Sequence, residues 1–327
     1  MAPKIPFAPG SISFGHYTHD GLEPTPTIDT FIDQAVLAVR AGFDGVTISE
    51  HHAGFPTYLP NPLQATGWVL DAMPDGWAGP FPLLLPLRPP GIVVQELAWL
   101  EARYPHRITA GFAAGYVERD FDACGVPFAD RNSRFRESLG FVAQELSQPT
   151  ARFAGDRVVR DAAASGIPLL VAGGGPRAVA RAAELGLGLG VPADDPSETH
   201  AQYIAAGGTG PRVLMRWVWL GNMPDSTLRS WEKAHGSGSP RIVSSSDPAE
   251  IANRLVHDMQ STASTALSLR VHLPAVKPEE ANAQIEAIGS EVVPLVLAGL
   301  ASKNRLLGSA GGVVTTVSEK VVDQVCN

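Results

Sequence analysis

The sequence is poor in cysteine and in long apolar runs. Its 327 residues contain two cysteines, Cys124 and Cys326, whose separation matches neither a metal-binding spacing nor a disulfide framework. We expect both to be free thiols in a reducing cytoplasm. The longest apolar runs, such as residues 292–301, are shorter than the roughly 20 residues that a membrane-spanning helix needs. No secretory signal is apparent behind the first residues.

Clusters of basic residues are also missing. The 25 Lys and Arg are outnumbered by 33 Asp and Glu, which gives a formal net charge of −8. Nucleic acids and anionic membrane surfaces are therefore poor candidate partners. The 33 glycines and 28 prolines predict many turns on an otherwise ordered framework, because 44% of the residues are hydrophobic.

Short strand-like segments alternate with helical segments along most of the chain. The expected strands are residues 11–14, 45–49, 81–87, 107–113, 169–172, 187–191, 213–220 and 266–273. Helical periodicity is found at residues 28–41, 62–73, 92–104, 132–146, 177–185, 248–259 and 279–300. Eight strand–helix units predict an α/β fold, a (β/α)8 TIM barrel with loop insertions. We expect a single domain over residues 1–327, with residues 308–327 as a loose C-terminal tail.

Reactive groups of such a barrel lie where the strands end and the loops begin. Glu50, His51 and His52 directly follow the second expected strand. Histidine exchanges protons near neutral pH, so this position suits acid–base chemistry. Two alternatives remain: a histidine ring that only bonds a backbone carbonyl, or a metal site completed by His16 and His272.

A glycine turn follows the fifth expected strand. Gly173, Gly174 and Gly175 precede Pro176 and Arg177 at the start of a helix. Bare backbone amides, the helix N-terminus and one arginine together suit a bound phosphate. A tight turn without any ligand explains the same residues equally well. The turn matches neither the P-loop nor the dinucleotide-binding pattern.

A proline interrupts the third expected strand. Phe81-Pro82 predicts a cis peptide bond or a bulge at the barrel rim, because proline cannot donate to a strand ladder. An apolar wall is expected nearby from Phe14, Leu59, Phe81, Phe112 and Trp217. Taken alone, Arg131 reads as part of a solvated helix surface.

Several blocks in this order resemble the bacterial-luciferase-like flavin monooxygenase family. They are GFDGVTISEHH, RITAGFAAGYVERDFDACGVPFADRNSRF, VAGGGPRAVARAAELG, VLMRWVWLG and IVSSSDPAEIANRL. The resemblance implies a TIM barrel that binds reduced FMN supplied by a separate flavin reductase. Dioxygen would then react with the flavin to give a flavin peroxide, which inserts one oxygen atom into a small apolar organic substrate.

The resemblance also implies roles for individual residues. His51 matches the catalytic histidine of the family, flanked by Glu50 and His52. The implied cofactor-binding residues are Phe81, Pro82, Ala113, Ala114, Arg131, Ala172, Gly173, Gly174, Gly175 and Arg177. Ala114 stands where luciferases carry a flavin-contacting arginine, and the glycine turn replaces an acidic residue and a serine. Light emission is therefore not expected.

Two further functions fit the same resemblance. One is a deazaflavin-dependent oxidoreductase that transfers a hydride, because that branch has the same histidine position and a similar phosphate loop. The other is a non-catalytic flavin-binding subunit. The family also implies a homodimer, while no metal ion, nucleic acid or membrane is expected as a partner.

Overall fold

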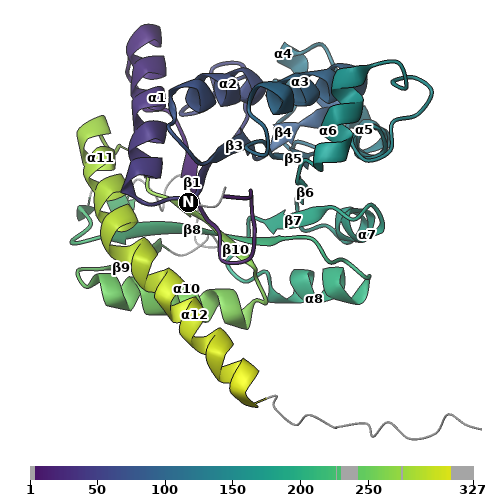
Figure 1. The fold of residues 1–327 in the computed structure, drawn as a ribbon. Helices are drawn as coiled ribbons and strands as arrows, with labels where there is room; N and C mark the ends of the chain where they lie inside the picture. The colour runs from purple at the N-terminus through teal and green to yellow at the C-terminus, as the bar shows by residue number, and fades with distance from the viewer. Residues whose placement is uncertain (1–3, 226, 230–241, 274, 311–327) are drawn as a thin grey trace, which may run out of the picture.

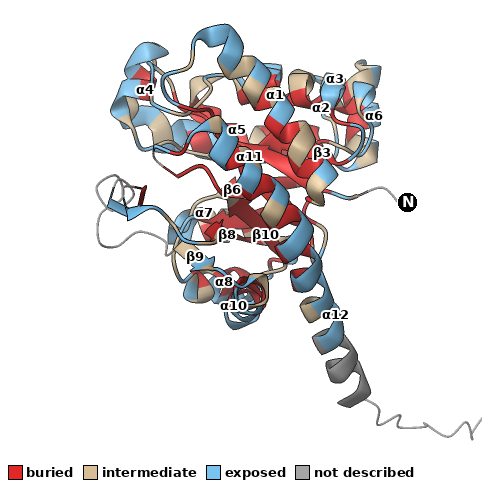
Figure 2. Cartoon of the chain, turned by 90° about the vertical axis from the view of Figure 1, so that its left-hand side faces the viewer, coloured by how far each residue is buried: buried red, intermediate tan, exposed pale blue. Residues whose placement is uncertain are grey.

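The computed structural model describes residues 4–225, 227–229, 242–273 and 275–310. The strands are β1 (Ile12–His16), β2 (Gly45–Ile48), β3 (Trp77–Pro80), β4 (Leu83–Leu84), β5 (Ala110–Ala113), β6 (Leu169–Ala172), β7 (Gly188–Val191), β8 (Arg212–Leu220), β9 (Ile242–Ser245) and β10 (Ala266–Arg270). The α-helices are α1 (Pro24–Ala41), α2 (Pro62–Ala72), α3 (Pro90–Arg103), α4 (Glu118–Ala123), α5 (Arg131–Glu145), α6 (Arg157–Ser165), α7 (Pro176–Glu184), α8 (Ser197–Ala205), α10 (Pro248–Ser261), α11 (Pro278–Ala287) and α12 (Val293–Ala310). In Figure 1 the helices surround the strands, and Figure 2 shows the buried residues concentrated on the strands.

The strands form a nearly closed parallel barrel. Their order is β3-β2-β1-β10-β8-β7-β6-β5-β4, with β9 paired to the end of β8. A parallel bridge between Ala78 and Ile108 joins β3 to the segment that leads into β5. Because β3 and β4 are successive parts of one barrel strand, the path has eight positions. The TIM-barrel prediction is confirmed, although β9, α4, α6 and α8 were not anticipated.

The third barrel strand differs from its prediction. The sequence predicted one strand over residues 81–87, but the chain forms β3 before Phe81, the short β4 after Pro82 and a 3-10 turn at Leu85–Leu87. The Phe81-Pro82 peptide bond is cis, as predicted. The two prolines at 80 and 82 cannot donate to a ladder, so the apolar run could not continue as one strand.

Large aromatic side chains fill the barrel where inward-facing positions are glycine. A Cβ atom on Gly111 or Gly190 would lie 2.0 or 2.1 Å from the ring of Phe81. A Cβ on Gly45 would lie 2.2 Å from the ring of Trp77. These glycines let both rings cross the barrel interior, where Phe7 packs on them from the N-terminal segment. Together these rings form the apolar floor of the barrel.

Three residues of the expected apolar wall do not line the cavities described below. Phe14 and Phe112 are fully buried among residues that pack against the helices, and Leu59 packs at the edge of the same cluster. Side chains alternate across a strand, so Gly111 and Ala113 on the inner face direct Phe112 outward. Phe81 and Trp217 remain as wall residues of the cavities described below.

The last helices run along the outside of the barrel. The predicted helix over residues 279–300 is observed as α11, a π-helical turn (Ile288–Val292) and the beginning of α12. By length and composition, Pro278–Ser302 is apolar enough to cross a membrane, which the single apolar runs did not suggest. Its buried side chains, such as Ile285 and Val296, pack on the barrel in the manner of an outer helix. The expected tail begins inside α12, and residues 311–327 lie outside the described residues.

Candidate active site

A cavity of about 510 Å³ opens at the C-terminal ends of the strands. Its size is within the range of small-molecule and cofactor sites. The lining comes from segments that follow five or more different strands, as is usual for barrel enzymes. The lining residues are Tyr17, Ser49, Glu50, His51, Tyr58, Phe81, Pro82, Leu84, Ala113, Ala114, Gly115, Tyr116, Ala172, Gly173, Pro192, Met215 and Arg270.

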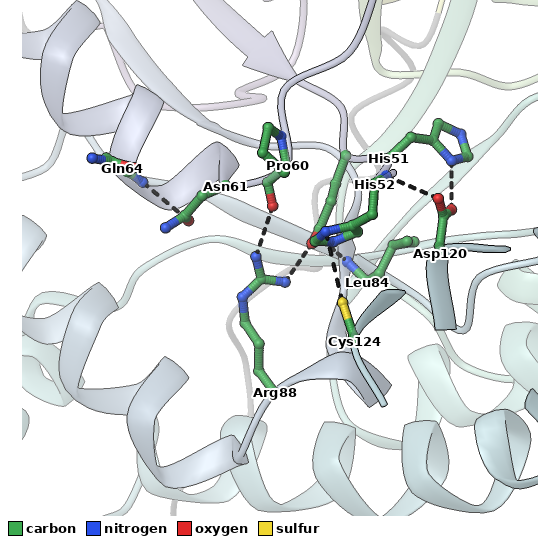
Figure 3. A network of polar contacts seen from close by, with 10 residues as sticks. His51, His52, Pro60, Asn61, Gln64, Leu84, Arg88, Asp120 and Cys124 are labelled. Atoms are coloured by element: carbon green, nitrogen blue, oxygen red, sulfur yellow. Dashed lines mark hydrogen bonds and ion pairs between the residues drawn. The ribbon is translucent and has the colours of Figure 1, made fainter. Parts of the chain in front are cut away.

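His51 is held in this cavity by a buried carboxylate. Its Nδ1 atom lies 2.7 Å from Oδ2 of Asp120, while the other carboxylate oxygen accepts a 2.8 Å hydrogen bond from the backbone N–H of His52 (Figure 3). Asp120 is fully buried on α4. A carboxylate at Nδ1 favours the tautomer that carries its proton there, which leaves Nε2 free to accept a proton. The ring stacks on Phe55 at 4.1 Å and meets the edge of Tyr58 at 4.6 Å.

Glu50, which also lines the cavity, and His52 belong to a second polar network. Glu50 Oε2 accepts from the backbone N–H of Leu84 at 2.6 Å, and Oε1 lies 2.5 Å from Arg88 Nη1 and 2.7 Å from His52 Nε2 (Figure 3). The other ring nitrogen of His52 lies 3.7 Å from the Cys124 sulfur. These contacts join the end of β2 to β4, to Arg88 before α3 and to Cys124 at the end of α4. Of the two histidines, His51 lines the cavity and His52 is turned toward Glu50.

The glycine turn lies at one end of the cavity, where β6 leads into α7. Added Cβ atoms on Gly173 and Gly175 would meet nothing within 4 Å, so open space adjoins the backbone here. On Gly174, by contrast, a Cβ would lie 3.1 Å from Val191. Arg177 is exposed in the first turn of α7. An open backbone at a helix N-terminus beside a cation fits a phosphate group.

Two tyrosines supply neutral hydroxyl groups to the cavity. Burial raises the pKa of the Tyr58 phenol far above its ordinary value. Partial desolvation and the neighbouring Tyr17 raise the pKa of Tyr116, whose side chain is largely exposed. Both therefore remain protonated over the usual working range of pH and can donate hydrogen bonds.

A second cavity of about 550 Å³ adjoins the first. The two share Tyr17, Tyr58 and Tyr116, and the second extends to Phe55, Trp217, His19 and His272. Gln34 lies beneath it, with Oε1 2.9 Å from His272 Nε2 and 3.2 Å from His19 Nε2.

The histidines around this second cavity do not form a metal site. Burial lowers the pKa of His272 well below its ordinary value, and burial lowers that of the neighbouring His16 to about 3, so both rings are neutral. Across the described ranges, no three or more His, Cys, Asp or Glu side chains are arranged to hold a metal ion.

Comparison with known proteins agrees with this geometry. Residues 10–206 match the model of the luciferase-like monooxygenases, which is more than half of the chain. The chain belongs to this family. The prediction of a luciferase-like oxidoreductase is thereby confirmed, since such family members are flavin- or F420-dependent monooxygenases and oxidoreductases.

Some of the curated relatives are F420-dependent dehydrogenases. An F420-dependent glucose-6-phosphate dehydrogenase of Beutenbergia cavernae is 32% identical over 168 residues, which are 47% of this chain and 49% of that protein. The chain spans about half or less of the length of the curated relatives that it matches.

Solved structures of the same family share the fold. The oxygenating constituent of 3,6-diketocamphane monooxygenase from Pseudomonas putida, in complex with FMN, superposes with a TM-score of 0.67 and 17% identity over 88% of this chain and 98% of its own. An F420-dependent secondary alcohol dehydrogenase superposes with a TM-score of 0.68 and 17% identity over 88% of this chain and 98% of its own. The monooxygenase RslO1 of Streptomyces bottropensis superposes with a TM-score of 0.71 and 16% identity over 87% of this chain and 99% of its own.

The structure brings most of the sequence-derived luciferase-like site residues together. His51, Glu50 and six of the implied cofactor residues line the first cavity, namely Phe81, Pro82, Ala113, Ala114, Ala172 and Gly173. The residues outside this lining are His52, Arg131, Gly174, Gly175 and Arg177. The Arg131 guanidinium stacks on Phe128 at 4.0 Å and donates to the Phe128 carbonyl at 3.1 Å. Contact between Arg131 and a phosphate therefore stays a prediction.

Two charged residues of the cavity region escaped the sequence analysis. Asp120 is one of four charged residues in VERDFDA, a pattern typical of a solvated helix surface, and its distance of 69 residues from His51 gave no spacing signal. Arg270 ends the last barrel strand, in SLRVHL, whereas the expected strand over residues 266–273 placed it in mid-strand. Tertiary structure alone brings them to the cavity.

Proposed function

We propose that this protein is a reduced-FMN-dependent monooxygenase that inserts one oxygen atom from dioxygen into a small organic substrate. The observation that carries the proposal is the buried Asp120–His51 pair, which faces a cavity floored by the cis Phe81-Pro82 segment at the C-terminal ends of the strands. The residues present fit a flavin mononucleotide. The turn at Gly173 to Gly175 leaves open space at a helix N-terminus for the phosphate, and the apolar cavity suits a planar ring.

Residues of this chain would bind the phosphate, exclude water from the ring and transfer a proton. When bound, the reduced flavin supplies the electrons that activate dioxygen. The glycine turn and Arg177 would hold the phosphate, while Phe81, Pro82 and Ala114 would exclude water from the ring. His51 would accept or return a proton at Nε2, with Asp120 stabilising the charged ring from Nδ1.

The second cavity would take the substrate. Its walls are largely aromatic, from Tyr17, Phe55, Tyr58 and Trp217, and the buried His272 ring is neutral. A neutral, mainly apolar molecule with one hydrogen-bonding group fits such walls. A separate reductase would supply the reduced FMN, as the family resemblance implies.

A second candidate is hydride transfer with a deazaflavin cofactor. Its specific support is the 32% identity to an F420-dependent dehydrogenase. The same histidine and phosphate turn would serve this chemistry, and no oxygen would be consumed.

Anaerobic titration with photoreduced FMN, followed by mixing with aerated buffer in a stopped-flow spectrometer, tests the proposal. We expect a tight complex and a transient species whose spectrum differs from both reduced and oxidised FMN. Weak FMN binding together with tight F420 binding would replace the monooxygenase by the deazaflavin enzyme. If the His51→Ala variant converts every substrate as fast as the unchanged protein, His51 has no catalytic role.

A further inference from the structure

Arg270 places a cation inside the first cavity. It is the last residue of β10, and its side chain crosses the inner face of β1 at Gly15. A Cβ atom on Gly15 would lie 2.8 Å from Cγ and 3.3 Å from Nε of Arg270. The missing side chain at residue 15 is therefore what makes room for the arginine.

The guanidinium of Arg270 packs on aromatic rings and a thioether. It lies 5.4 Å from the ring centre of Tyr17 and 5.5 Å from that of Trp217, and Nη2 contacts the Met215 sulfur at 3.0 Å. Its Nε is buried and has no hydrogen-bond partner among the residues that the structure describes. Within the described part of the chain, no carboxylate forms an ion pair with it.

The acidic groups nearest the cavity already have partners. Glu50 binds Arg88, His52 and a backbone amide, and Asp120 binds His51 and a second backbone amide. Aromatic faces and a thioether compensate only part of the lost hydration of a guanidinium. A planar anion that accepts two parallel hydrogen bonds would supply the missing interaction.

We propose that Arg270 recognises the anionic edge of the reduced flavin ring. Two-electron-reduced FMN carries negative charge on its N1–C2–O2 edge after losing the N1 proton, whereas the oxidised ring is neutral. That edge presents two acceptors side by side, which match the guanidinium fork. Arg270 lines the first cavity and is absent from the lining of the second, so the cofactor ring is the fitting ligand and an anionic substrate is not.

This inference rests on the proposed function and predicts an effect of Arg270 on the redox potential of the bound flavin. Selective binding of the anionic reduced ring raises the midpoint potential of the bound flavin, because affinity for the two redox states sets the potential. It also makes the protein prefer the reduced flavin that a reductase would deliver. Gly15 serves as the position that permits this geometry.

The test compares the affinity of Arg270 variants for oxidised and reduced FMN. For Arg270→Met, we expect binding of photoreduced FMN under anaerobic conditions to weaken roughly 10- to 100-fold and binding of oxidised FMN to change less than about threefold. Each tenfold difference lowers the two-electron potential of bound FMN by about 30 mV. Arg270→Lys, which keeps the charge but loses the fork, should give an intermediate change.

Arg177→Met is the matched control. Phosphate is present in both redox states, so loss of a phosphate contact should weaken both equally and leave the potential unchanged. Equal effects of Arg270→Met on both states, or no effect on either, would overturn the role of Arg270. If that variant does not fold, as judged by circular dichroism, Arg270→Gln carries the same comparison. If the unchanged protein fails to bind reduced FMN, the proposed function itself is wrong.

Discussion

Asp120 and His51 are joined by a 2.7 Å contact between Oδ2 and Nδ1, which links helix α4 to the end of β2. Both side chains are almost fully buried, at 0% and 7% exposure. A buried carboxylate on one ring nitrogen fixes both the tautomer and the orientation of the imidazole. The proton-accepting atom of His51 is therefore set by a residue from another barrel unit.

Replacing Asp120 by Asn should slow turnover by roughly 10- to 100-fold, because the amide can donate to Nδ1 and favour the wrong tautomer. Affinity for reduced FMN should change less than about threefold. Steady-state rates and anaerobic titration measure the two effects, and nitrogen-15 NMR of the ring reports the tautomer directly. Asp122→Asn, on the exposed side of the same short helix, is the control and should leave all three unchanged. An unaltered tautomer in Asp120→Asn would contradict this role.

Replacing Arg177 by Gln should weaken FMN binding about tenfold and leave riboflavin binding unchanged, because riboflavin has no phosphate. Fluorescence titration with both flavins measures the difference. Arg157→Gln removes an equally exposed cation at the start of α6 and should affect neither ligand. A parallel loss of affinity for both flavins would place Arg177 near the ring or in the fold instead of at the phosphate.

Replacing Gly190 by Ala should destabilise the fold by about 1–3 kcal/mol, because the new methyl would lie 2.1 Å from the Phe81 ring. Displacement of that ring should also weaken flavin binding, since Phe81 forms part of the cavity wall. Urea unfolding gives the free energy of unfolding. Gly155→Ala is the control, because its Cβ would meet nothing within 4 Å. Equal stability of the two variants would show that Phe81 does not fill the barrel as described.

Stability should fall as the pH drops below about 6.5, the ordinary pKa of histidine. Burial lowers the pKa of His16 to about 3 and that of His272 well below its ordinary value. Between pH 6.5 and the lowered pKa of the folded state, each of these histidines binds a proton in the unfolded chain but not in the folded chain. Each therefore lowers the free energy of unfolding by up to about 1.4 kcal/mol for every unit that the pH falls. Above pH 6.5 both rings are neutral in either state and the effect vanishes.

Urea unfolding at pH 7.5 and pH 5.5 measures this dependence. In His16→Gln, the loss of unfolding free energy between these two pH values should be about 1.4 kcal/mol smaller than in the unchanged protein, since glutamine does not titrate. His257→Gln removes an exposed histidine and should leave the dependence as it is. An unchanged dependence in His16→Gln would mean that His16 takes up its proton in the folded protein.

The barrel and part of its site could be predicted because their signals are local. The strand–helix alternation, the histidines that follow β2 and the glycine turn after β6 each lie within a few consecutive residues. Local patterns failed at β3 and β4, where an apolar run suggested one strand and two prolines divided it. They failed also for Phe112, whose direction depends on which neighbours face the barrel axis.

The sequence by itself determined the kind of protein: a parallel barrel with a histidine and a glycine turn at the strand ends. Tertiary structure decided which charges meet in the cavity. Asp120 reaches His51 from 69 residues away, and Arg270 enters the space that Gly15 leaves on a strand at the other end of the chain. Barrel closure sets the Arg270–Gly15 approach, because it places the first and last strands side by side. The Asp120–His51 contact joins the segments that follow β5 and β2, and no spacing along the chain records either proximity.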